Sequence, residues 1–338
     1  GQVIGLADTT GATVASHLHL TLKLEGATKR GETKYPKDII DPTPFMVWPN
    51  LKSAKNLPKS DGTPTKCLYG LHGRVGGSLT PEDVALIQGS RLEAVKLDRR
   101  ESLTTLHALR EDDPTRLIVI RLDGQFDAGP VRPDEFVNLV DDDVRRFNDA
   151  GIRHFELLSS PNLQSDGWGR SWRDGFEFGQ WWLDVFDRLR SVYPEAKFGF
   201  PGLSPGEAVR GWRAEALSFM EQAEAAIGSA DWLGVNCIWT DRSSMGALFA
   251  GRLYNEVRLR FPDKLLFITE FYNASERVSE VDKATEYLEF YRSLRGERGI
   301  GAAFAYALSA ESGHETLVFR GEGQDRSLMM ERVNQGLR

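Results

Sequence analysis

The stretch "RLIVIRLDGQFDAGPVRPDEFVNLVDDDVRRFNDAGIRHFELLSS", residues 116–160, contains one strand–helix–strand unit. Its two ends, 116–123 and 152–160, are apolar runs of the length of buried strands. Between them, "RPDEFVNLVDDDVRRFNDAG" has the spacing of an amphipathic helix and closes at Gly151, a residue that commonly ends a helix. Strands that alternate with helices in this way predict parallel βαβ units.

The same alternation continues through most of the chain. The strand-like runs are "CLYGLHG" from Cys67, "LEAVKLD" from Leu92, "RLIVIRLD" from Arg116, "IRHFELLSS" from Ile152, "KFGFPG" from Lys197, "DWLGVNCIW" from Asp231, "KLLFITEFY" from Lys264 and "IGAAFAYALS" from Ile300. Helical stretches lie between them, such as "TPEDVALIQGSR", with Thr80 as the N-cap and Pro81 in the first turn. Eight units in about 270 residues predict an α/β fold of the closed (β/α)8 TIM barrel type. A doubly wound open sheet is the alternative, but "GLHGRVGGS" lacks the glycine spacing of a dinucleotide-binding turn.

The segment before the barrel differs in pattern. In "VIGLADTTGATVASHLHLTLKLEG" apolar and polar residues alternate between Gly and Thr turns, which predicts short antiparallel strands in a small partial β segment. "PNLKSAKNLPKSDGTPTK", from Pro49, is rich in Pro, Lys, Ser and Gly and has no hydrophobic periodicity. We therefore expect a fragment at 1–48, a linker at 49–65 and the barrel at 66–338.

Composition narrows the classes of function. The 338 residues are 41% hydrophobic and carry a formal charge of −7, which fits a globular chain without a basic stripe for nucleic acid or an anionic membrane. Cys67 and Cys237 each lie in an apolar run, and their spacing suits neither a disulfide framework nor a zinc finger. No apolar run is long enough to cross a bilayer. We expect no cofactor, no nucleic acid and no membrane partner.

Candidate site residues are those at the carboxyl ends of the predicted strands, because chemistry in a barrel belongs to that face. Aromatic rings stack on the C–H faces of a sugar, while carboxylates and amides bond its hydroxyls, so this mixture suits a carbohydrate. For any single residue, packing under a loop or capping a helix is the competing explanation. The candidates are His72, Asp98, Asp123, Ser160, Asn162, Asn236, Trp239, Glu270, Tyr272 and Tyr306.

In their order along the chain, three of these segments resemble the retaining glycoside hydrolases of the clan A barrel type. "FELLSSPN" (155–162) is similar to the "YEIWNEPN" segment of that group's fourth strand. "GVNCIW" (234–239) stands where the sixth strand often carries His-x-Tyr, and "FITEFY" (267–272) is similar to "ITEFG" on the seventh. The resemblance covers the chain from about Cys67 to Ala310, and it implies a barrel that acts on or binds glycans.

The same resemblance implies an altered catalytic pair. Glu270 matches the nucleophile, but Ser160 occupies the acid/base position and Ser159 replaces a sugar-binding asparagine. A serine hydroxyl has no carboxyl proton to give near neutral pH, so it cannot perform general acid catalysis. Asn236 and Ile238 stand where histidine and tyrosine would orient the nucleophile.

Another acid could replace the missing one. Glu156 shares strand parity with Ser160 but should lie deeper in the barrel, where we expect a structural role. Acids on the loops are the remaining candidates, and Asp166 ranks first because Trp168 and Trp172 beside it would form a sugar platform. Asp241 and Glu311 are the other two loop acids.

A second resemblance covers about the first 46 residues. "GQVIGLADTTGATVASHLHLTLK" followed by "IDPTPFM" is similar to the C-terminal part of lysostaphin-like zinc peptidases, which cut peptide cross-links in bacterial walls. It implies that His17 and His19 are vestiges of a catalytic histidine and a zinc ligand. A catalytic zinc needs three protein ligands, and the others lie upstream in that family, so we expect no metal here. The match also implies a longer parent chain with a peptidase domain and an extracellular or cell-envelope location.

Three hypotheses follow from these patterns. The first is a glycosidase with Glu270 as nucleophile and an unidentified acid, weak on natural glycans. The second is a non-catalytic barrel that binds a glycan of the cell wall and positions a peptidase. The third is a structural spacer.

Overall fold

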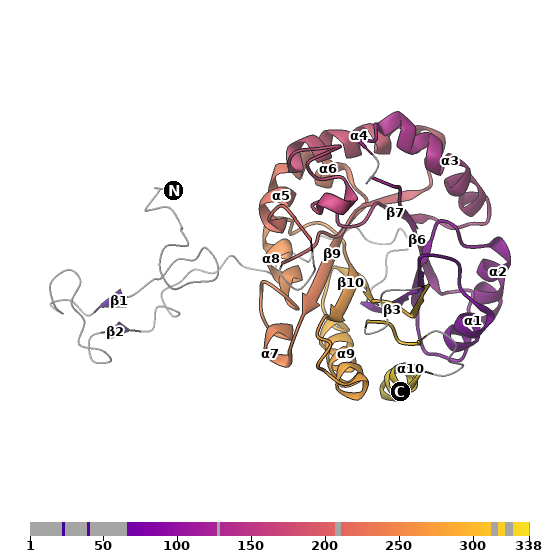
Figure 1. Cartoon of the computed structure of the whole chain (residues 1–338), viewed down its shortest axis with the longest axis vertical. Coiled ribbons are helices and arrows are strands. Elements are labelled where there is room, and N and C mark those ends of the chain that lie inside the picture. Colours follow the sequence, from indigo (N-terminus) through magenta and orange to yellow (C-terminus); the bar gives the residue numbers. More distant parts are fainter. Residues whose placement is uncertain are drawn as a thin grey trace. The chain divides into compact units, whose positions relative to one another are not determined.

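The computed structural model describes residues 66–126, 129–206, 211–311, 317–321 and 327–337, together with two short strands near the N-terminus (Figure 1). The chain divides into two compact units, Gly1–Asn50 and Leu51–Arg338. In the first unit, β1 (Leu22–Lys23) pairs antiparallel with β2 (Ile39–Ile40). The expectations for His17, His19 and the linker at 49–65 lie outside the described residues.

In the second unit, eight strands close into a parallel barrel in the order β10-β11-β3-β5-β6-β7-β8-β9. Their bounds are β3 (Leu68–His72), β5 (Ala94–Asp98), β6 (Leu117–Leu122), β7 (His154–Leu157), β8 (Lys197–Phe200), β9 (Trp232–Trp239), β10 (Leu266–Asn273) and β11 (Ile300–Ala305). Each predicted run supplies one strand. The predicted (β/α)8 TIM barrel is therefore confirmed, and the open-sheet alternative is wrong because the strands close on themselves.

Helices surround the barrel on its outer side (Figure 1). Their bounds are α1 (Pro81–Gln88), α2 (Leu103–Asp112), α3 (Pro133–Asp149), α4 (Gly175–Val192), α5 (Ala216–Gln222), α6 (Glu224–Ser229), α7 (Arg242–Met245), α8 (Leu253–Arg260), α9 (Glu280–Leu294) and α10 (Leu328–Gly336), with a 3-10 turn η3 (Gln164–Asp166). Two further strands, β4 (Arg74–Val75) and β12 (Ser309–Ala310), pair parallel with each other. Within the described residues, no helix combines the length and apolar character needed to cross a membrane.

The helix ends follow the predicted signals. The Thr80 hydroxyl accepts a hydrogen bond from the backbone N–H of Asp83, and the Asp83 carboxylate accepts one from the N–H of Thr80, which completes a capping box at α1. After α3, Gly151 has a φ of +82°, in the left-handed region that glycine tolerates best. Local sequence therefore fixes where these helices begin and end.

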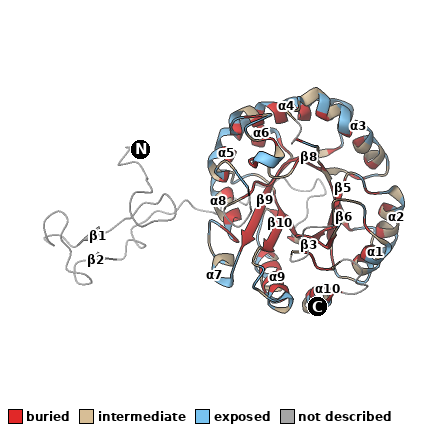
Figure 2. Ribbon diagram, viewed as in Figure 1, coloured by how far each residue is buried: buried red, intermediate tan, exposed pale blue. Residues whose placement is uncertain are grey.

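The barrel strands are largely buried (Figure 2). The buried hydrophobic residues form two clusters, a small inner core inside the barrel and a larger core under its helices. The inner core comprises Ala94, Val119, Trp232, Phe267, Ala302 and Phe304. Trp232 stacks on Phe267, with ring centroids 4.7 Å apart. Large side chains thus fill the amino-terminal part of the barrel, as in other TIM barrels, and polar groups take the positions beyond them.

Gly199 on β8 tests the tightness of this inner core. A Cβ atom there would lie 2.1 Å from the Trp232 ring, which is itself buried. We expect Gly199→Ala to lower the free energy of unfolding by about 1–3 kcal/mol, because the ring must move in a packed interior. Urea denaturation measures the change. Gly228→Ala on α6 is the control, since no atom lies within 4 Å of its added methyl, and equal losses in both variants would contradict the prediction.

Candidate active site

Glu270, near the carboxyl end of β10, is the centre of the candidate site. Its Oε1 atom lies 3.4 Å from the Lys96 ammonium and 4.0 Å from Nη1 of Arg121, and it accepts a 3.4 Å hydrogen bond from the Ser159 hydroxyl. Its Oε2 atom accepts no hydrogen bond from the described residues, and a tenth of the side chain remains exposed. One oxygen is therefore held by the protein while the other stays available.

A register shift in β10 gives Glu270 its direction. Phe267 belongs to the inner core, and strict alternation would turn a residue three positions later to the outside. The pairing of β10 with β9 shifts between Ile268 and Glu270, and Phe271 packs outward on α9 against Phe290. Irregularities of this kind re-aim side chains beside active sites, and here the shift turns Glu270 inward.

Lys96 on β5 joins Glu270 to a second carboxylate. Its ammonium is wholly enclosed and contacts Oε2 of Glu156 on β7 at 3.1 Å as well as Glu270 at 3.4 Å. Glu156, which we expected deep in the barrel with a structural role, is thus linked to Glu270 through the Lys96 ammonium. Glu156 is only 1% exposed, below Glu270 in the barrel, and burial raises its pKa although Lys96 acts in the opposite direction.

Two arginines organise the acids predicted on strands two and three. Arg121 on β6 lies 3.6 Å from Asp98 and 3.4 Å from Asp123. Arg100 makes two 2.8 Å bonds to Asp98 and holds the pKa of that carboxyl below its ordinary value, although burial opposes this. Asp98 is closed to solvent, whereas about a third of the Asp123 side chain is exposed. Only Asp123 of this pair can meet a ligand directly.

Ser160 follows β7 in an uncommon backbone conformation. Its φ is +47° and that of Leu158 is +73°, both in the left-handed region that bulky residues avoid. The Ser160 hydroxyl accepts a 3.3 Å hydrogen bond from Asn236, whose side-chain oxygen accepts a 2.8 Å bond from Thr269. The structure thus brings Ser160, Asn236 and, through Ser159, Glu270 into one polar cluster.

The remaining predicted residues divide into two groups. Tyr272 and Tyr306 pack at 5.0 Å between ring centroids, and His72 lies 5.5 Å from Tyr306, so these three form one aromatic group near Glu270. Asn162 and Trp239 do not join the site. The Asn162 side chain bonds the backbone of Ser204 and Ala214, and the Trp239 indole donates to Glu286 on α9.

Those two assignments were wrong for physical reasons. Trp239 is three positions after the inward-facing Asn236, so its ring faces outward, where it stacks on Phe271. Asn162 is fully buried and fixes the loop that follows β8. Neither side chain can contact a sugar at the carboxyl ends of the strands.

The loop after β7 contains the acid ranked first among possible replacements. Asp166, in η3, is half-buried, and burial raises its pKa to about 6, with smaller contributions from Glu270 and Asp123. Trp172 is not part of a sugar platform, because it is buried among Phe126, Phe178 and Trp181. The partly exposed Trp168 donates its indole N–H to the backbone of Arg173.

Sequence reasoning missed Lys96 and Arg121. Each is two residues before a predicted site acid, Asp98 or Asp123, so strand alternation places it on the same inward side. A charged residue at an inward position of a buried strand was the available signal. Within the described part of the chain, no cluster of three or more His, Cys, Asp or Glu side chains is arranged to hold a metal ion.

Comparisons with solved structures match the fold of this chain to barrels of glycoside hydrolases. No protein-family model matches the sequence, and no curated protein is significantly similar to it. Solved structures do match. An endo-β-1,3-glucanase of family GH128 from Sorangium cellulosum has 13% identity and a TM-score of 0.57, and the alignment covers 80% of this chain and 98% of the other.

Two other structures show a similar fold. A GH5-4 broad-specificity endoglucanase from Clostridium acetobutylicum has 12% identity and a TM-score of 0.56, with 81% and 96% coverage. A GH128 exo-β-1,3-glucanase from Blastomyces gilchristii, solved with glucose, has 13% identity and a TM-score of 0.52, with 78% and 97% coverage. The second unit of this chain therefore shares the (β/α)8 barrel fold of these glycoside hydrolases.

Asp166 should make stability depend on pH. Since its pKa is raised from 3.8 to about 6, its stabilising contribution is complete below pH 3.8 and is lost as pH rises through about 6. Asp166→Asn should therefore be more stable than wild type above pH 6, by about 1 kcal/mol after allowance for solvent screening, and equal to it near pH 4. Thermal unfolding at both pH values measures this, and a gain that is the same at both would contradict it.

Lys96 should be essential to the packing of the barrel interior. Lys96→Met removes the ammonium that Glu156 and Glu270 share, and we expect a loss of about 3–5 kcal/mol, as for other broken buried ion pairs. Adding Glu156→Gln should recover part of that loss, because one uncompensated carboxylate is then neutral. Denaturant unfolding of the single and double variants measures the coupling. Strictly additive losses would show that the two groups do not interact.

Proposed function

We propose that the barrel binds a glycan at the carboxyl ends of its strands, with Glu270 in the position of a retaining nucleophile and without a general acid on strand four. The observation that carries this proposal is the arrangement of Glu270 itself. Lys96, Arg121 and Ser159 surround Oε1 and stabilise its negative charge, while Oε2 remains available to an anomeric carbon.

Retaining hydrolysis also requires a carboxylic acid that protonates the departing oxygen, with the two carboxyl groups about 5–5.5 Å apart. Glu156 cannot fill that role, because it is enclosed below Glu270 and bound to Lys96. Ser160 stands where the acid is expected, and its hydroxyl is engaged by Asn236. Without an acid, only substrates whose leaving group needs no proton should react.

Asp166 is the next candidate for the general acid. A pKa of about 6 would keep a fraction of its carboxyl protonated near neutral pH, which is the property required of a general acid. Its place in the loop after strand four, and the influence of Glu270 on its pKa, support a position on the same face. If Asp166 acts in this way, natural glycans would be cleaved and the cleavage would depend on that residue.

The second candidate function is a non-catalytic glycan-binding barrel that positions a cell-wall peptidase. Two features favour it. The Glu270 carboxylate is held in an ion pair with Lys96 and neutralises part of the buried charge of that ammonium. Glu270 therefore has a structural role that does not depend on catalysis. The sequence-based expectation that residues 1–46 resemble zinc peptidases is the second feature, and it implies a wall-associated peptidase partner.

Restoring the acid distinguishes these functions. We expect wild-type protein to hydrolyse dinitrophenyl β-glycosides slowly and to leave β-1,3-glucan, β-1,4-glucan and β-mannan nearly untouched. Ser160→Glu should raise activity on unactivated substrates by some part of the roughly 10²- to 10⁴-fold supplied by general acid catalysis. Reducing-sugar release and aryl-group release measure the two reactions.

The controls are Glu270→Gln and Ser160→Gln. Glu270→Gln should abolish aryl glycoside cleavage, whereas Ser160→Gln adds the bulk of glutamate without its proton and should show no gain. Wild-type cleavage of natural glycans that is lost in Asp166→Asn would replace the missing-acid proposal with Asp166 catalysis. Glycan binding without any cleavage, retained in Glu270→Gln, would favour the non-catalytic function.

A further inference from the structure

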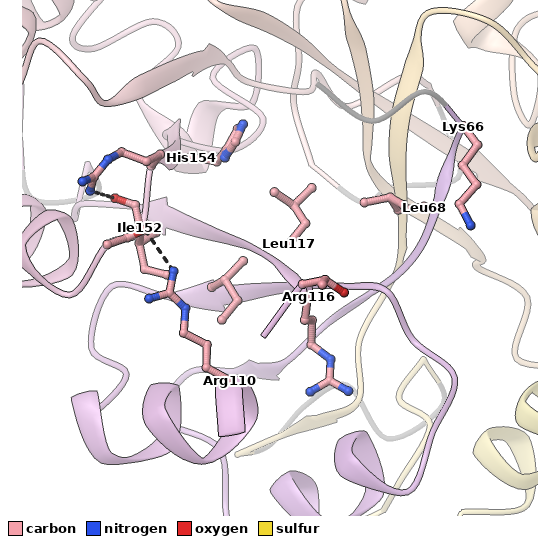
Figure 3. A pocket seen from close by; sticks show the side chains of 11 residues that line it. Lys66, Leu68, Arg110, Arg116, Leu117, Ile152 and His154 are labelled. Atoms are coloured by element: carbon pink, nitrogen blue, oxygen red, sulfur yellow. Dashed lines mark hydrogen bonds between the residues drawn. The ribbon is translucent and has the colours of Figure 1, made fainter. Parts of the chain in front are cut away.

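A cavity lies at the opposite end of the barrel from Glu270. Its volume is about 430 Å³, and its wall is formed by residues at or just before the amino-terminal ends of β3, β6 and β7, by Arg110 near the end of α2 and by Gly151, which follows α3. Leu68 and Leu117 contribute apolar surface. Figure 3 shows these two side chains between Lys66 on one side and His154 on the other.

Cationic side chains dominate the polar part of this wall. Lys66, Arg110, Arg116 and Arg153 all line the cavity, and no acidic residue is among the described residues that do so. The chain as a whole carries a formal charge of −7, so a surface of this kind is contrary to its overall balance. The local positive charge therefore calls for a specific explanation.

Hydrogen bonds to backbone carbonyls at the end of α3 explain part of the positive charge of this cavity. Arg110 donates to the backbone oxygens of Ala150 and Gly151, and Arg153 donates to those of Asn148 and Ile152. A helix end carries only about half a negative charge, whereas these two guanidiniums bring two full positive charges to the end of α3. Neither guanidinium has a carboxylate within 4 Å among the described residues, so positive charge remains uncompensated there.

Arg116 provides an internal contrast. Its guanidinium is nearly enclosed, bonds the backbone oxygens of Leu92 and Leu109, and pairs with Asp112 at 2.7 Å. Those contacts are what an arginine with a purely structural role makes. Arg153 instead uses only Nη1, and its Nε and Nη2 donors bond none of the described residues.

We infer that this cavity binds a small organic phosphate, with the phosphate bonded by Arg153 and Arg110. Lys66, whose ammonium pairs with Glu93 at 3.0 Å, adds positive charge to the wall of the same cavity. A guanidinium with two unused donors matches the oxygens of a phosphate, and charge-assisted bonds of this kind are strong. The cavity is larger than a phosphate group needs, and Leu68 and Leu117 offer apolar contact to an organic body attached to it. The inference does not depend on glycan chemistry at the other end of the barrel.

Phenyl phosphate is the probe that tests this inference, because it joins a phosphate to a small apolar ring. Isothermal titration and amide chemical shifts should show one site on the full chain, with changes at Leu117 and Ile152. Arg153→Gln should weaken binding about tenfold or more, and Arg153→Lys by less, since charge is kept and the planar donors are lost. Lys66→Gln, at a half-exposed side chain, should weaken binding by a few-fold and is the second variant if Arg153→Gln fails to fold.

The control is Arg188→Gln, which removes an exposed arginine of α4 that pairs with Asp184 outside the cavity and should leave binding unchanged. Inorganic phosphate should bind more weakly than phenyl phosphate, and phenol should not bind. Equal affinity for inorganic phosphate would overturn the assignment of an organic ligand. No binding of either anion, or binding that is unchanged in both Arg153→Gln and Lys66→Gln, would overturn the inference and leave Arg110 and Arg153 with only their bonds to the end of α3.

Discussion

The enclosed positive charge of Lys96 is the constraint on which the centre of the barrel depends. Removing an ammonium from water costs several kcal/mol even after the protein relaxes, so the charge needs partners of opposite sign at contact distance. Glu156 and Glu270 supply them from β7 and β10. One lysine thus ties three strands of the barrel together, and it requires a carboxylate at position 270 whether or not that carboxylate reacts.

Strand alternation arranges the interior in layers of different chemistry. On β5, Ala94, Lys96 and Asp98 follow one another inward, and on β6 the sequence is Val119 and Arg121, with Asp123 just beyond the strand. Along β5 and β6, the inward positions therefore change from apolar to cationic to acidic toward the carboxyl end of the strand. The cations hold the acids in place, and the apolar layer below excludes water from the lysine.

Periodicity and turn signals were enough to predict the fold, because each strand is an apolar run and each helix is amphipathic with caps such as Thr80 and Gly151. They also placed Glu270, Asp123, Ser160 and Tyr306 correctly near the carboxyl ends. The register shift in β10 was not predictable, since the letters "FITEFY" do not show where alternation breaks. Trp239 was misplaced for the opposite reason, because alternation held on β9 and turned it outward.

Helix dipoles favour charged side chains of opposite sign at the two ends of the barrel. Helices run antiparallel to the strands. Their positive ends therefore lie on the side of the acids near Glu270, and their negative ends lie on the side of the arginines at the cavity by the amino-terminal ends of the strands. A charged side chain that only caps a helix needs no partner other than the backbone groups at the helix end. Oε2 of Glu270 and the Nε and Nη2 donors of Arg153 bond none of the described residues. Both groups can also meet a ligand, because Glu270 is partly exposed and Arg153 lines a cavity, whereas Oε1 of Glu156, which likewise has no hydrogen-bond partner, is enclosed.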